Sequence, residues 1–158
     1  MKRSTLTMKS IFQSMMEEGY YPTYENTHIV FGIEDNLAVV EQDEGMISVR
    51  LFFGIEEDMY DLFLEAANET MMKTLGVKPV VLSDMKNLMF SCEFLCDSLG
   101  EFRKFFPRGI ALLQKAIKIH KSEMKKLLVE ENLTIKADQP SEDIPLLNDW
   151  SGMHKVVS

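Results

Sequence analysis

Residues 27–54 read THIVFGIEDNLAVVEQDEGMISVRLFFG, and this stretch decides the fold. Apolar and polar residues alternate along three runs, which are residues 27–33, 37–42 and 46–53. An alternation with a period of two is typical of a strand that buries one face. The segments between the runs are rich in Asp, Glu, Asn and Gly, which favour tight turns. The stretch therefore predicts three antiparallel strands in succession, which need a second layer of structure to cover their apolar face.

The flanking segments are expected to supply that layer and to extend the sheet. Residues 8–18 and about 56–75 carry apolar residues at spacings of three and four, which predicts a helix in each. The apolar face of the second helix, read as continuing through Met71 to Leu75, would cover the sheet. Residues 77–82 and 88–96 read as two more strands. Pro79 has no amide hydrogen, so it favours the edge of the sheet or the start of its strand.

The last regular element is a third helix that ends near Val129. Ser98 and Glu101 match a capping box, in which each residue satisfies an unpaired amide of the other at a helix start. Pro107 lies inside the apolar pattern and must either kink this helix or open another one. The predicted fold class is therefore α+β: an antiparallel sheet of about five strands packed by helices, in the order helix, three strands, helix, two strands, helix.

Residues 1–129 are expected to form one domain, and residues 130–158 an acidic, mobile tail. Ile144, Leu147 and Trp150 are the apolar residues of interest in this tail. They could fold back over a groove of the domain as a latch, or they could be offered to another protein as a binding motif. Plain disorder is the simplest alternative.

Composition and charge argue against several classes of function. The formal net charge of −8 argues against a nucleic-acid partner, because phosphates would be repelled unless the few basic residues were gathered into one patch. The sequence has no run of about 18 apolar residues, so neither a transmembrane helix nor a membrane partner is expected. No apolar signal-peptide core follows the basic N-terminus, which makes the cytoplasm the default location.

The residues that could carry chemistry form no recognisable motif. Cys92 and Cys96 would lie about 13 Å apart in one strand, too far for a disulfide, so both should be reduced and buried. His28 is expected to be an exposed strand residue, and His120 a helix residue with a hydrogen-bonded ring. Since there is also no metal-ligand spacing and no glycine-rich phosphate loop, we expect no enzyme activity, no metal and no cofactor.

The methionines are the more informative feature, since twelve are present and two pairs are adjacent. In each adjacent pair, one side chain must point away from the main apolar stripe of its helix. Flexible thioethers suit surfaces that accommodate different partners, which makes Met16, Met71 and Met72 candidate partner-binding residues. Packing against the sheet or against a dimer mate is the simpler explanation for the same residues.

The order of elements resembles the YbjN family and, through it, the fold of type III secretion chaperones. The matching segments lie within residues 8–128: the helix end from Phe12 to Tyr20, the strand at residues 47–51, the helical residues 66–68, and the alternating strand at residues 88–95. The resemblance implies a small, acidic, cytoplasmic bacterial protein without enzyme activity, often a homodimer, paired through the second helix or the fourth strand. Chaperones of this fold bind extended protein segments along apolar grooves.

The predicted function is therefore a non-catalytic, chaperone-like domain that binds a protein or peptide. The first alternative is a small-molecule-binding or catalytic domain whose site is assembled only in three dimensions. A purely structural subunit is a further alternative. A polar pocket holding His28 or His120 beside a cysteine or carboxylate would favour the first alternative, and an apolar surface with exposed methionines would favour the binding domain.

Overall fold

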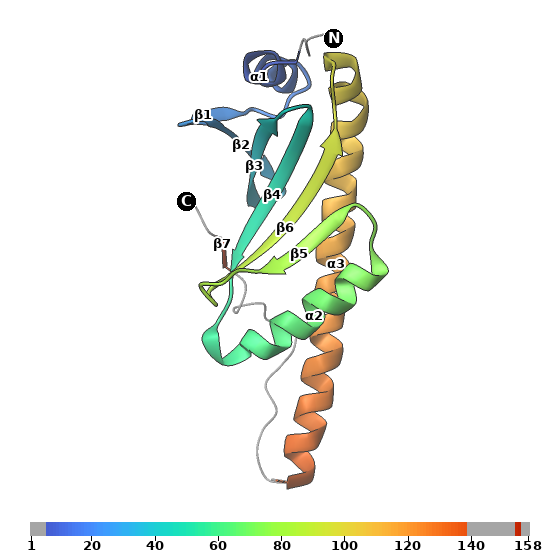
Figure 1. The fold of residues 1–158 in the computed structure, drawn as a ribbon. Coiled ribbons are helices and arrows are strands. Elements are labelled where there is room, and N and C mark those ends of the chain that lie inside the picture. Colours follow the sequence, from blue (N-terminus) through green and yellow to red (C-terminus); the bar gives the residue numbers. More distant parts are fainter. Residues whose placement is uncertain (1–5, 139–153, 156–158) are drawn as a thin grey trace.

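The computed structural model describes residues 6–138 and 154–155 and confirms the α+β class (Figure 1). All the predicted helices and strands are present, in the predicted order. The elements are α1 (Met8–Glu17), β1 (Thr23–Glu25), β2 (His28–Ile33), β3 (Asn36–Asp43), β4 (Met46–Gly54), the 3-10 turn η1 (Glu57–Met59), α2 (Tyr60–Lys73), β5 (Val77–Val81), β6 (Asn87–Leu95), α3 (Leu99–Asp138) and β7 (His154–Lys155).

The strands form one antiparallel sheet, in which six follow the order β1-β2-β3-β4-β6-β5 and the short β7 pairs with the end of β4. The meander β2-β3-β4 is built as its alternation predicts, with Val40 opposite Val49. After α2 the chain returns through β5 and then places β6 next to β4, where Leu51 lies opposite Phe90. This route leaves β5 as the outermost strand, which confirms the edge position predicted from Pro79.

One face of the sheet packs against the helices. Figure 1 shows α3 running behind the sheet along the length of the molecule, with α1 near one end of the sheet and α2 near the other. The large apolar side chains between these layers are fully buried, namely Ile11, Met15, Phe63, Leu88, Phe90, Phe102, Phe106, Leu113 and Met124. These residues include the inward positions of every predicted amphipathic helix, so the periodicity located the core correctly.

The capping motif at the start of α3 is present in a modified form. The Glu101 amide donates to Ser98 Oγ at 3.1 Å, as predicted. The Glu101 carboxylate, however, accepts from the Ser98 hydroxyl at 3.4 Å, whereas a capping box would have it accept from the Ser98 amide. The serine therefore satisfies one of the unpaired amides at this helix start.

The structure corrects two predicted boundaries. The last helix continues from Leu99 to Asp138 and does not end near Val129. Pro107 lies inside this one helix and does not start a second one. The second helix is shorter than predicted, because a 3-10 turn precedes α2 and Thr74 is already extended. No helix among residues 6–138 is long and apolar enough to cross a membrane.

Candidate partner-binding surface

The outer side of α2 and the residue that follows its end expose several large apolar side chains. Met71 is 46% exposed, Met72 84% and Leu75 85%. Leu64 lies seven residues before Met71, on the same side of the helix, and is also exposed. We call Leu64, Met71, Met72 and Leu75 the α2 apolar surface. This surface corrects the predicted apolar face of α2, since Met71 and Leu75 are exposed although both were expected to help cover the sheet.

The opposite side of α2 is buried in the core, and this packing holds the helix that carries the α2 apolar surface in place. Phe63, Ala66, Ala67 and Thr70 are buried there. The Thr70 hydroxyl donates to the Ala66 carbonyl at 2.7 Å, which satisfies the one polar group on this side. The exposed residues are therefore not needed to hold α2 in place, and their apolar character calls for another explanation.

A buried charge cluster ties the end of α2 to α3. The carboxylate of Glu123, which is 6% exposed, accepts hydrogen bonds from Lys73 of α2 and from Lys126 of α3. The bond from Lys73 lowers the pKa of Glu123 and raises the pKa of Lys73, so both stay charged near neutral pH. Because its charge is compensated on both sides, Glu123 is suited to holding two helices together rather than to accepting a proton.

The α2 apolar surface adjoins the outermost strand. Gly76 connects Leu75 directly to Val77, the first residue of β5. Strand β5 pairs with β6 on one side only, and no strand of the described residues pairs with its other edge. An exposed edge can accept an extended segment of another chain through backbone hydrogen bonds. The apolar side chains and the free edge thus lie next to each other.

The face of the sheet away from the helices carries a row of alternating charges. His28 Nδ1 lies 3.4 Å from Glu41, and Arg50 lies 3.6 Å from Glu41 and 3.8 Å from Glu93. Lys78 continues the row on β5, 3.0 Å from Glu93. The hydrogen bond from Lys78 lowers the pKa of Glu93, with a smaller contribution from Arg50. The row crosses five strands, and each of the charges on Glu41, Arg50, Glu93 and Lys78 faces an opposite one.

A shallow hollow of about 270 Å³ lies over this row, between β3, β4 and β6. Its lining residues are Glu41, Asp43, Met46, Ile47, Ser48, Arg50 and Glu93. The volume is slightly below the range of about 300–1,000 Å³ that is common for small-molecule sites. Arg50 and Ser91 also bond to each other at 3.4 Å, so most of the polar groups near the hollow are already engaged. The hollow offers few free groups for a ligand.

The sequence matches no protein-family model and no curated protein. In three dimensions the chain is similar to the crystal structure of YbjN, described as "a putative transcription regulator from E. coli". The two structures superpose with a TM-score of 0.64 over 79% of this chain and 97% of the other, at 11% sequence identity. The chain has the YbjN fold. The resemblance expected from the sequence is thereby confirmed for the fold, and at this identity it shows the fold alone.

Within this YbjN fold, His120 differs from its prediction. It is fully buried between the rings of Phe63 and Phe90, at centroid distances of 5.7 and 5.5 Å. The Phe63 backbone lies near the ring, but neither ring nitrogen has a partner with hydrogen-bond geometry among the described residues. The predicted hydrogen-bonded ring is therefore wrong. Burial lowers the pKa of His120 to about 4, so the imidazole is neutral at pH 7.

The remaining candidates for chemistry lie apart from one another. His28 is partly exposed on the sheet surface beside Glu41. Cys92 and Cys96 are buried free thiols, as predicted, and burial raises the pKa of each. Since the thiolate is the reactive form, both cysteines are poor nucleophiles. Among the described residues, no cluster of three His, Cys, Asp or Glu side chains could hold a metal ion.

The predicted partner-binding residues divide into three groups in the YbjN fold. Met71 and Met72 lie together on the α2 apolar surface. Met16 is 48% exposed while Met15 is buried, which confirms that one of the pair points outward. However, Met16 belongs to α1, near the other end of the sheet from α2 (Figure 1). Three further candidates lie outside the described residues: Ile144, Leu147 and Trp150.

Proposed function

We propose that this chain is a non-catalytic, chaperone-like domain that binds a protein or peptide through the α2 apolar surface, in the cytoplasm and as a homodimer. The observation that carries the proposal is the exposure of Met71, Met72 and Leu75 next to the free edge of β5. The core of this chain does not need these side chains. A partner that covered them would remove their apolar area from water.

The energetics favour an apolar contact at this site. Complete burial of a methionine or leucine side chain contributes roughly 1.5–3 kcal/mol, and two of these residues are more than four-fifths exposed. Methionine side chains have several rotatable bonds and a polarizable sulfur, so they adapt to partners of different shape. The adjoining edge of β5 would add backbone hydrogen bonds that depend little on the partner's sequence.

The charged row on the other face of the sheet supports a binding domain over a catalytic one. Glu41, Arg50 and Glu93 all have opposite charges within 4 Å, so none of them is held ready for a reacting group. Catalytic acids and bases usually stand in a cleft with a pKa moved toward neutrality. The shift at Glu93 is downward, away from neutrality.

A matched pair of substitutions tests the proposed function. Leu75→Glu places a charge within the α2 apolar surface, and Leu95→Glu places one at a 71% exposed leucine of β6. Both proteins and the wild type would be used to capture partners from native lysate. We expect the wild type and Leu95→Glu to retain the same stoichiometric partner, and Leu75→Glu to lose at least nine-tenths of it. Equal capture by both variants would rule out this surface.

Light scattering separates a dimer surface from a client surface. If α2 pairs two copies of the chain, Leu75→Glu should have the mass of one copy where the wild type has that of two.

A chain ending at Asp138 tests the predicted role of Ile144, Leu147 and Trp150. Stronger partner binding by the shortened chain would indicate a latch, and weaker binding would indicate a motif.

A further inference from the structure

Helix α3 collects nearly half of the positive charge of an acidic protein. Residues 102–129 contain eight of the seventeen lysine and arginine residues of the chain and only one acid, Glu123. That acid is buried and bonded to Lys73 and Lys126. The net charge of −8 therefore conceals a strongly basic segment. This segment meets the condition under which an acidic chain could still attract phosphates.

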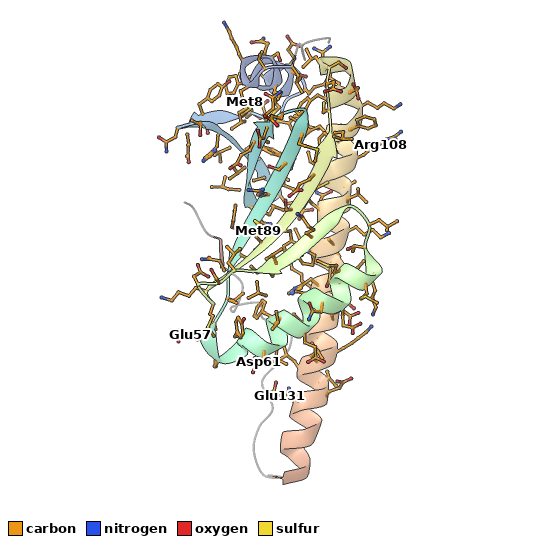
Figure 2. All side chains as sticks on the ribbon, in the orientation of Figure 1. Met8, Glu57, Asp61, Met89, Arg108 and Glu131 are labelled. Atoms are coloured by element: carbon orange, nitrogen blue, oxygen red, sulfur yellow. The ribbon has the colours of Figure 1, made fainter. Side chains whose placement is uncertain are left out.

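Five of these cations share one face of α3. They follow one another at intervals of four, seven, three and seven residues, which returns side chains to the same side of a helix, and all five are exposed. We call them the α3 basic row: Lys104, Arg108, Lys115, Lys118 and Lys125. At 1.5 Å per residue the row is about 32 Å long. Figure 2 shows Arg108 on the side of α3 that is turned away from the strands.

Within residues 6–138 and 154–155, no acidic side chain neutralises the basic row. Among the described residues, none of its five members forms an ion pair, whereas the neighbouring Arg103 pairs with Glu17 at 3.0 Å. Exposed helix faces usually mix acids with bases, because like charges one turn apart, such as Lys104 and Arg108, repel. An anion bound from outside would relieve this repulsion along the whole row.

We infer that the α3 basic row binds the phosphate backbone of a double-stranded nucleic acid. A straight helix with cations at regular intervals fits a linear, rigid polyanion better than a compact one. Phe105, the aromatic residue beside the row, is half-buried, covered by Lys104 and packed against Phe94, so its ring is a poor platform for unpaired bases, which disfavours a single strand. Ala111 and Ser122, which are exposed on the same face, are too small to insert into a membrane, and the larger exposed Leu112 and Val129 lie at the edge of this face and beyond its end. Contacts of this kind fix position without reading sequence.

The acidic end of the molecule limits where the duplex can lie. Asp58, Asp61, Glu65, Glu130 and Glu131 surround a hollow of about 340 Å³ between the start of α2 and the last turns of α3. Figure 2 shows Asp61 and Glu131 at this end. These carboxylates repel phosphates, so the duplex should cross the part of α3 from Lys104 to Lys118, and Lys125 should contribute least.

Fluorescence anisotropy of a labelled 20-base-pair duplex of arbitrary sequence tests this inference on the full chain. We expect binding with a Kd on the order of 10 μM at about 50 mM salt. Five contacts at most give a slope of log K against log salt no steeper than about −4.5, since each phosphate contact contributes about −0.9. The double variant Lys115→Gln/Lys118→Gln should bind at least tenfold more weakly, with a slope shallower by about 2.

The control variant also loses two lysine charges, but at positions outside the α3 basic row. Lys9→Gln/Lys86→Gln removes two exposed lysines from α1 and from the turn before β6, and should change the affinity less than threefold. Circular dichroism would confirm that both variants are folded. Equal losses in the two variants would overturn the inference, as would no binding by the wild type at low salt. Stronger binding of single strands, or of anionic lipid vesicles alone, would also overturn it. The row is separate from the α2 apolar surface, so this inference does not depend on the proposed function.

Discussion

His120 combines complete burial with a ring that has no hydrogen-bond partner among the described residues. It packs between Phe63 of α2 and Phe90 of β6, so it joins three elements as an apolar side chain would. Burial lowers the pKa of His120 and outweighs the Phe63 backbone and, more weakly, Glu123, which both favour the protonated form. The imidazole can stay in this site only while it is neutral.

Acid should destabilise the protein through this residue. The pKa of His120 is about 4 in the folded chain and 6.5 ordinarily, so the unfolded chain binds the proton at the higher pH. Stability must therefore fall as the pH drops from 6.5 toward 4. The contribution of His120 to this loss should reach about 2.5 kcal/mol by pH 4.5. Urea unfolding at several pH values measures this loss.

Two substitutions isolate the effect. His120→Met keeps a side chain of similar volume without a titratable group, so it should remove most of the pH dependence between 6.5 and 4.5. Met124→Leu changes another fully buried side chain of α3 without removing a titratable group, and should leave the wild-type pH profile in place. A His120→Met protein that followed the wild-type curve would show that other groups cause the acid sensitivity.

Among the elements, the joint between α2 and β5 depends on one residue. Gly76 has a φ of +77°, a backbone conformation that L side chains rarely adopt. A Cβ added there would also come within 3.4 Å of Leu112 Cδ1 of α3. The residue thus allows the chain to turn from helix to strand beneath the α2 apolar surface.

Gly76→Ala should lower the free energy of unfolding by about 1 kcal/mol, because the left-handed backbone is costly for alanine. Gly100→Ala is the matched control. Gly100 lies in the first turn of α3, where an added Cβ would meet only Ser98 Oγ at 3.9 Å. There alanine should be neutral or should stabilise by up to about 1 kcal/mol. Equal effects in thermal or urea unfolding would contradict the strain at Gly76.

The elements that could be predicted are those in which apolar residues recur at the period of a strand or helix and so form one buried side. The alternation of β6 and the helical spacing of α3 persist because each buries one side. Strand β1 has only three residues, all exposed, so it had no pattern to find. The last turns of α3 were missed because the apolar spacing fades after residue 130, although the helix continues to Asp138.

The candidate surfaces were predictable only in part, because they depend on pairings between distant segments. Met72 was found because adjacent methionines on a helix cannot both face the core. Leu75 was assigned to the core because spacing alone does not show where a helix stops. The contact of Arg50 with Glu93 depends on the register of β4 against β6, which no local pattern specifies. The α3 basic row was not predicted, because the net charge of −8 drew attention away from the regular spacing of its lysines and arginines.

For the whole molecule, Pro79 affects whether two copies of the chain can associate by pairing the exposed edges of their β5 strands. It leaves one position of the outermost strand without an amide donor, and prolines on edge strands limit uncontrolled pairing. Pro79→Val restores the donor and should increase self-association beyond that of the wild type, as light scattering over a concentration series would show. Val80→Thr changes the same strand but keeps the proline, and should match the wild type. No difference between the two variants would exclude a protective role for Pro79.

The placement of α3 has a consequence for how the protein is made. Six of the seven strands, β1 to β6, precede α3 in the chain, and this helix packs on β6, β5, α1 and α2. A ribosome that has released the sheet has therefore not yet released the helix that covers Leu88 and Phe90. During synthesis these side chains remain in contact with water or with a folding factor until about thirty more residues emerge. The last helix, rather than the first hairpin, thus completes the core of the nascent protein.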